Sequence, residues 1–103
     1  MEHAVIVHLK LSDEGFATEK LDAIGELQRE MTQAIENAYV GEFDGNEIGG
    51  GECVLYMYGV DADALFAVVK PLLKASPSAK GGFAIKRYGE ASDPGAREVE
   101  VRW

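Results

Sequence analysis

A run of twelve residues in the middle of the chain holds its densest glycines and carboxylates: Gly41-Glu-Phe-Asp-Gly-Asn-Glu-Ile-Gly-Gly-Gly-Glu52. It leads directly into the apolar segment Cys53–Tyr58. The glycines of Gly49–Gly51 can reverse the chain, because glycine adopts backbone angles that other residues avoid. We therefore interpret this stretch as a β-hairpin, with Asp44-Gly45 forming a bulge or turn in its first strand.

Hydrophobic residues spaced at helical intervals precede the hairpin. From about Thr18 to Tyr39 they recur every three or four positions, which places them on one stripe of a helix. The stripe consists of Leu21, Ile24, Leu27, Met31, Ile35 and Ala38. We expect Asp13 or Thr18 to cap this helix, after a loop over residues 12–15, and Gly41 to stop it. Gly25 inside it costs about 1 kcal/mol against alanine, which suggests close packing against a neighbour.

A second helix is expected after the hairpin, with Asp61 as its N-cap and Asp63 adding a favourable charge in the first turn. Pro71 removes a backbone donor from the late part of this pattern. The helix should therefore kink or end near Lys70, with a final turn reaching Ala75.

Segments rich in β-branched residues predict strands over residues 4–11, 41–48, 52–58, 83–88 and 99–103. In the first strand, one side is expected in the core: Val5, Val7, Leu9 and Leu11. The other side becomes polar toward its end: Ala4, Ile6, His8 and Lys10. The strand 52–58 is apolar on both sides, which indicates an interior position in the sheet.

This order of elements predicts a single α+β domain over residues 1–103. It matches the ferredoxin-like β-α-β-β-α-β arrangement, an antiparallel sheet with two helices on one face, plus an extra C-terminal strand. The other face of the sheet must meet water, a ligand or a second subunit.

The net charge of −8 is concentrated in the middle of the chain. No basic residue occurs between Arg29 and Lys70, where eight carboxylates lie, and the rest of the chain carries ten acids and ten bases. Such a region repels phosphate, which argues against nucleic-acid binding. It suits a cationic ligand, a metal ion or a basic protein surface, and an acidic surface also simply maintains solubility.

The remaining composition indicates a cytoplasmic protein. No apolar run approaches the ~20 residues that span a bilayer, and the first eight residues lack the basic start of a signal peptide. The single cysteine, Cys53, lies in an apolar strand and suits a reduced, packed thiol.

Four side chains of the hairpin form the first candidate site: Asp44, Asn46, Glu47 and Glu52. Their oxygens are ligands that hard cations prefer. The spacing fails the EF-hand pattern, however, and the glycines are not followed by the Gly-Lys-Ser/Thr of a phosphate-binding loop. A glycine hairpin with polar turn residues is the favoured interpretation of the stretch over a binding role, and we predict neither a metal nor a cofactor.

His8 is a candidate general base if a carboxylate lies near it, although a half-exposed strand histidine without a chemical role is the favoured interpretation. Tyr56 and Tyr58 alternate on one face of their strand, as Lys86 and Tyr88 do on theirs. If all of them share the face of His8, they form an aromatic and basic platform. RNA-binding sheets use such platforms, but the charge of this chain is adverse. We favour tyrosines that fill a subunit interface or the edge of the core.

The hairpin run, with Leu55-Tyr-Met-Tyr-Gly59, Asp61-Ala-Asp63 and Ile85-Lys-Arg-Tyr-Gly89, resembles a family of small bacterial proteins of unassigned function. The resemblance covers roughly residues 40–90 and implies no activity. In fold order and charge alone, the chain is also similar to acidic ferredoxin-like domains that inhibit ribonuclease E by binding protein.

Two hypotheses follow. In the first, the chain is a non-enzymatic binding or regulatory module, which engages a basic protein through residues 41–63 and forms a homodimer through its open sheet face. In the second, it is a small acid–base enzyme with a pocket between sheet and helices. His8 or Glu52 would then move protons, and Tyr58 or Tyr88 would orient the substrate.

Overall fold

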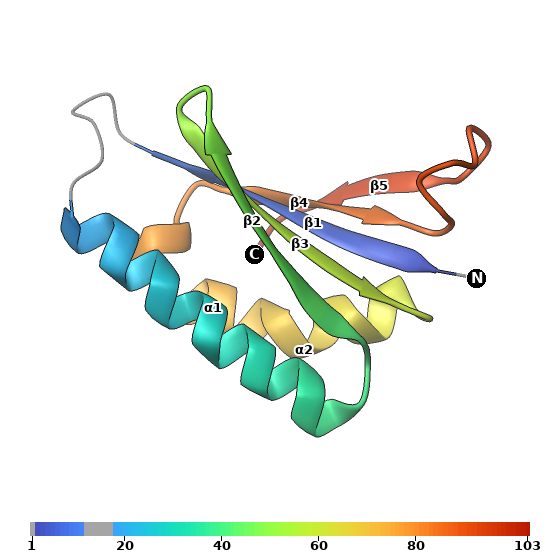
Figure 1. The fold of residues 1–103 in the computed structure, drawn as a ribbon, viewed down its shortest axis with the longest axis horizontal. Helices are drawn as coiled ribbons and strands as arrows, with labels where there is room; N and C mark the ends of the chain where they lie inside the picture. Colours follow the sequence, from blue (N-terminus) through green and yellow to red (C-terminus); the bar gives the residue numbers. More distant parts are fainter. Residues whose placement is uncertain (1, 12–17) are drawn as a thin grey trace.

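The computed structural model describes residues 2–11 and 18–103. It shows an α+β fold with a five-stranded antiparallel open sheet and two α-helices, in the chain order β1-α1-β2-β3-α2-β4-β5 (Figure 1). The elements are β1 (His3–Lys10), α1 (Thr18–Ala38), β2 (Glu42–Gly49), β3 (Glu52–Gly59), α2 (Ala62–Ala75), a 3₁₀ turn (Pro77–Ala79), β4 (Phe83–Arg87) and β5 (Glu98–Val101). The strands lie in the order β2-β3-β1-β4-β5, and with β5 added at the edge the sheet is not strictly of ferredoxin topology.

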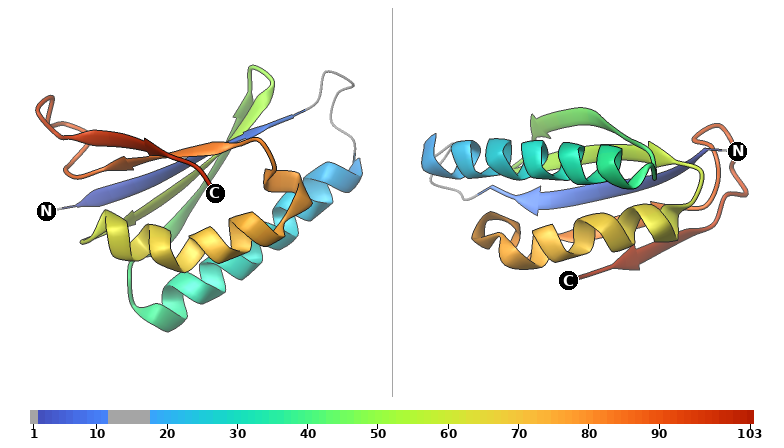
Figure 2. Two further views of the ribbon diagram at one scale, coloured as in Figure 1. Left: turned by 180° about the vertical axis from the view of Figure 1, so that it is seen from behind. Right: turned by 90° about the horizontal axis from the view of Figure 1, so that it is seen from below.

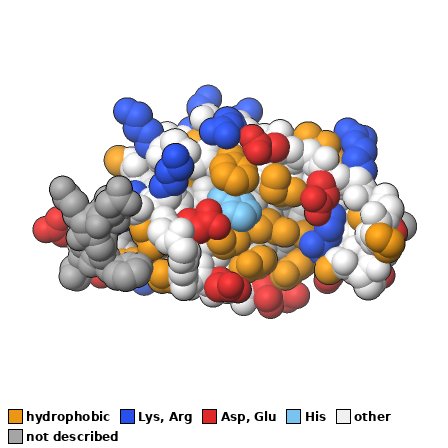
Figure 3. Space-filling model, turned by 90° about the horizontal axis from the view of Figure 1, so that it is seen from above, with side chains coloured by type: hydrophobic (Ala, Val, Ile, Leu, Met, Phe, Trp, Pro, Cys, Tyr) orange, Lys and Arg blue, Asp and Glu red, His pale blue; other side chains and the backbone are white. Residues whose placement is uncertain are grey.

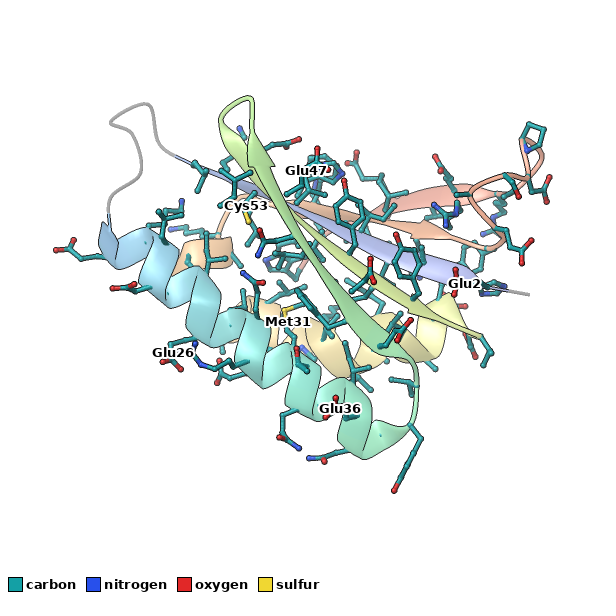
Figure 4. All side chains as sticks on the ribbon, viewed as in Figure 1. Glu2, Glu26, Met31, Glu36, Glu47 and Cys53 are labelled. Atoms are coloured by element: carbon teal, nitrogen blue, oxygen red, sulfur yellow. The ribbon has the colours of Figure 1, made fainter. Side chains whose placement is uncertain are left out.

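Both helices pack on the same face of the sheet, which gives the described part of the chain two layers (Figure 2). The alternate residues expected in the core of β1 are buried: Val5, Val7, Leu9 and Leu11. They meet the helical stripe, of which Ile24, Leu27, Met31 and Ile35 are buried. Figure 4 shows Met31 between α1 and the sheet, with Glu26 on the solvent side of the helix. Burial of this apolar surface drives the two layers together.

The β2–β3 hairpin forms as predicted. Gly50 and Gly51 have φ values of 58° and 80°, and this pair of positive angles is typical of the tight type I′ turn. The pairing register shifts between Phe43 and Gly45, which confirms the bulge. β3 lies inside the sheet between β2 and β1, whereas β2 forms one edge.

α1 ends differently from the prediction, which placed its stop at Gly41. Tyr39 takes the left-handed conformation instead, with φ of 55°. The backbone N–H of Val40 donates to the carbonyl of Ile35 (3.4 Å), and that of Tyr39 donates to Glu36 (3.2 Å). This pair of backbone hydrogen bonds is the Schellman pattern, which here closes a helix without glycine. The predicted caps Asp13 and Thr18 and the loop 12–15 fall on residues or side chains outside the described part.

α2 begins as predicted and continues further than Lys70. The Asp61 carboxylate accepts hydrogen bonds from the backbone N–H groups of Asp63 (3.0 Å) and Ala64 (3.2 Å). The helix runs through Pro71 to Ala75, so the final turn is formed. Pro71 leaves the carbonyl of Ala67 without its helical donor, and the helix continues past that position nonetheless.

The expectation that Gly25 packs closely against a neighbour is wrong. A Cβ atom built there would come no nearer than 4.0 Å to another group, the guanidinium of Arg29. A tightly packed glycine lies instead at Gly59, where a Cβ would stand 2.2 Å from the carbonyl oxygen of Val40.

Candidate functional site

The sheet face turned away from the helices carries side chains from all five strands, and we call it the open face. Paired residues of neighbouring antiparallel strands point to the same side of a sheet. His8 pairs with Val54 and Phe83, and one step along the sheet Ile6 pairs with Tyr56 and Ile85. Two residues before Ile6, Ala4 pairs with Tyr58 on one side and with Arg87 on the other. Figure 3 views the molecule from this side.

The middle of the open face is apolar. Hydrophobic side chains surround the histidine in Figure 3. They are Ile6, Val54, Tyr56, Tyr58, Phe83 and Ile85, of which Val54 is buried and the others are half-buried. Among the described residues, no helix covers them. The two layers of the fold therefore leave an apolar surface open on one side.

His8 lies at the centre of this surface, held between an aromatic ring and a carboxylate. Its ring stacks on Phe83 with centroids 4.7 Å apart and planes 5° from parallel. Its Nδ1 lies 3.3 Å from both carboxylate oxygens of Glu52, so Nδ1–H can donate to them. The carboxylate required for a general base is thus present. Glu52 pairs with Lys10, two residues after His8 in β1, so its side chain lies on the same face of the sheet as His8.

Tyr56 and Tyr58 form the wall of a shallow hollow beside the hairpin. The hollow has a volume of about 300 Å³, and Asp44, Gly45, Asn46 and Glu47 complete its lining. Burial raises the pKa of the Tyr56 hydroxyl, and the negative charge of Glu47 raises that pKa further. Tyr56 therefore stays protonated in the physiological range and presents a hydrogen-bond donor beside an acidic edge.

The hairpin side chains divide between the two sides of the sheet. Glu47 pairs with Val54 and projects above the sheet in Figure 4. Asn46 pairs with Leu55 of the core side, and its amide donates to Gln28 of α1 (2.9 Å). Within residues 2–11 and 18–103, no three His, Cys, Asp or Glu side chains gather as metal ligands would.

The condition for an aromatic and basic platform, that Lys86 and Tyr88 share the face of His8, is not met. Lys86 pairs with the buried Val5, so it points to the helix-covered side. There Asp63 accepts hydrogen bonds from Lys86 (2.8 Å) and from the Tyr88 hydroxyl (2.6 Å). These bonds lower the pKa of Asp63, and the bond from Asp63 raises that of Lys86. Tyr88 thus belongs to a contact between β4 and α2.

The space between sheet and helices, where an enzyme pocket was expected, is filled by core side chains such as Met31 and Leu55. His8, Glu52 and Tyr58 face the other side of the sheet. Cys53 is buried on the core side, and burial raises the pKa of its thiol.

Several residues of the open face are not among the sequence candidates. They are Ile6, Val54, Phe83, Ile85, Arg87 and Arg102. The alternation of Phe83 and Ile85 is a visible signal of a second apolar strand face. Arg102 lies over the ring of Phe83 (5.5 Å), which places it on the same side.

No family model, curated protein or solved structure matches the chain. Among the described helices, none combines the length and the apolar character needed to cross a membrane.

Proposed function

We propose that this chain is a non-enzymatic, cytoplasmic binding module that recognises another protein through the open face. The observation that supports it most directly is the apolar centre of that face, which no described helix covers. Large contiguous apolar patches on single chains commonly mark interaction sites. Aromatic side chains in the middle and charges at the border are also the usual composition of a protein interface.

The charge at the hairpin edge supports a basic protein surface as the partner. Glu42, Asp44 and Glu47 are exposed, and among the described residues none of them forms an ion pair. Unpaired acids at the border of an apolar patch attract a basic surface and repel nucleic acid. A protein partner is therefore favoured over RNA.

The proposal includes two finer assignments. The arrangement β2-β3-β1-β4 with both helices on one face supports kinship with ferredoxin-like domains. The hairpin motif supports membership in the small bacterial family that the sequence resembles.

The buried, unpaired Cys53 is compatible with a reducing compartment.

A photo-crosslinking amino acid placed at Tyr56 tests the proposal in extracts of the source cells. We expect one discrete adduct at this position and none at Ala67, an exposed residue of α2 that serves as control. The adduct should weaken several-fold at high salt, and also in the variant Asp44→Asn/Glu47→Gln/Glu52→Gln. No adduct at Tyr56, or equal labelling at Ala67, would reject the proposal.

A further inference from the structure

We infer that the occupant of the open face is a second copy of this chain, related by a two-fold axis that runs parallel to β1. The inference rests on the proposed function and names its partner. Three observations support it: the position of β1 in the sheet, the distribution of charge on the open face, and the size of that face.

β1 is the middle strand of the sheet, with two strands on each side. Two sheets that pack face to face keep their strands within about 30° of each other. A two-fold axis in the plane of the interface therefore lies either nearly along the strands or nearly across them. The first choice places β2 of one copy over β5 of the other, and the second places β2 over β2.

The charges select the axis along the strands. The β2 border of the open face carries only acids, Glu42, Asp44 and Glu47. Near the opposite border lie Arg87 of β4 and Arg102, which follows β5, and basic side chains gather along one long border in Figure 3. An axis across the strands would oppose acids with acids. The axis along the strands instead places Glu47 opposite Arg102 of the second copy, and Glu42 opposite Glu98, beside which Arg87 lies in the register.

The opposite border also carries two acids, Glu98 and Glu100, but each has an arginine beside it. Glu98 pairs in register with Arg87, and Glu100 accepts a bond from Arg102 (3.2 Å). This border is therefore close to neutral, whereas the β2 border is acidic throughout. Association of unlike borders remains the favourable choice.

A rotation about this axis keeps each residue at the same height along the strand direction. The residues that face each other across the interface therefore follow from the strand register. At the level of His8, Glu47 faces Arg102 of the second copy, and Val54 faces Phe83. At the level of Ile6, Tyr56 faces Ile85. At the level of Ala4, Tyr58 faces Arg87, a pairing suited to cation–π attraction. The aromatic strand β3 thus covers the aliphatic and basic strand β4.

The open face also has an appropriate size for a dimer. Five strands about 4.8 Å apart, with central strands eight residues long, give a projected area of roughly 600 Å². A standard interface uses about 800 Å² of accessible surface on each partner. A second copy of the same face matches this requirement, with β1 crossing its own counterpart at the axis.

Sedimentation equilibrium of the full chain tests the inference through a charge exchange. Glu47→Arg alone and Arg102→Glu alone should each weaken dimerisation by about tenfold, because like charges then face each other. The double variant Glu47→Arg/Arg102→Glu should restore the dimer, since the two-fold axis recreates the opposite pair. Both side chains are exposed, so the fold itself does not depend on them.

Matched controls carry the same charge changes elsewhere. Glu36→Arg on α1 and Lys70→Glu on α2 alter exposed residues of the helical layer and should leave the dimer intact. A chain that stays monomeric at millimolar concentration overturns the inference, as does a dimer that Glu47→Arg and Arg102→Glu leave unchanged. If the chain is monomeric and the Tyr56 crosslinker still captures another protein in a salt-dependent way, the proposed function stands and only this inference fails.

Discussion

At the scale of single residues, glycine has opposite roles at two positions of this chain. At Gly59 the backbone passes the end of α1 so closely that a Cβ would lie 2.2 Å from the Val40 carbonyl oxygen. At Gly25 the same atom would come no nearer than 4.0 Å to another group, the flexible guanidinium of Arg29. The first glycine allows the hairpin to approach the helix, whereas the second lies within α1 and only weakens it.

We therefore predict that Gly25→Ala raises the free energy of unfolding by about 1 kcal/mol, because alanine restricts the unfolded chain and favours the helix. Gly59→Ala should lower it by about 1–3 kcal/mol, the usual range for overpacking. Urea unfolding with unchanged m-values measures both. A destabilised Gly25→Ala variant, or a neutral Gly59→Ala variant, would contradict this view of the two sites.

At the scale of elements, the carboxylate of Asp63 connects the first turn of α2 to β4 through hydrogen bonds. Asp63 accepts from Lys86 and from Tyr88, and the ring of Phe66 lies 5.7 Å below the Lys86 ammonium. Only 17% of the Lys86 side chain is exposed, so this charge depends on its partner more than a surface lysine would. The contact fixes the end of α2 against the sheet on the side opposite to the open face.

This contact should make stability depend on pH in the acidic range. The pKa of Asp63 is lowered in the folded chain, so the folded state binds fewer protons than the unfolded state. The stabilisation is complete above the ordinary carboxyl pKa of about 3.9 and is lost as the pH falls through the lower folded value. Asp63→Asn should be less stable than the parent at pH 7, and the difference should disappear near pH 2.

Denaturant titrations of the parent and of Asp63→Asn at both pH values measure this difference. Glu36→Gln, which removes an exposed carboxylate of α1, is the control and should show no such convergence. A constant difference between the parent and Asp63→Asn at all pH values would show that the carboxylate charge does not stabilise the contact.

The elements themselves could be predicted from the sequence, but the side on which the β4 side chains lie could not. Gly49–Gly51 and the period of the Ile24 stripe are local signals, and local interactions produce the corresponding structures. In β4, by contrast, the small Ala84 faces the core while Phe83 and Ile85 face outward. The size and hydrophobicity of Phe83 and Ile85 favour the opposite arrangement, with these two side chains in the core. The pairing of Ala84 with Val7 of β1 determines which side of β4 faces the core. The contact between His8 and Glu52 also depends on pairing across 44 residues.

At the scale of the whole molecule, the open face separates its apolar surface from its charges. The helical layer encloses the core, and the sheet presents its apolar centre between one acidic and one mixed border. A chain of net charge −8 would repel copies of itself if its acids were spread evenly. On the open face, however, only the β2 border is acidic throughout, so the two unlike borders of two copies can approach each other.

A dimer of this kind should show thermal unfolding that depends on protein concentration. The Tm of the parent should rise as the concentration is raised from micromolar to millimolar, because association stabilises the folded state by mass action. The Tm of Glu47→Arg should stay nearly constant over the same range. Differential scanning calorimetry measures both, and equal behaviour of the two proteins would argue against coupling between folding and association.

The central place of β1 also determines when the sheet can be completed during synthesis. β1 leaves the ribosome first, yet one of its neighbours ends at Gly59 and the other at Arg87. Until β4 has emerged, at least one edge of this apolar strand lacks its hydrogen-bonding partner. Completion of the sheet therefore depends on contacts between segments far apart in the chain, the kind of assembly that is intrinsically slow.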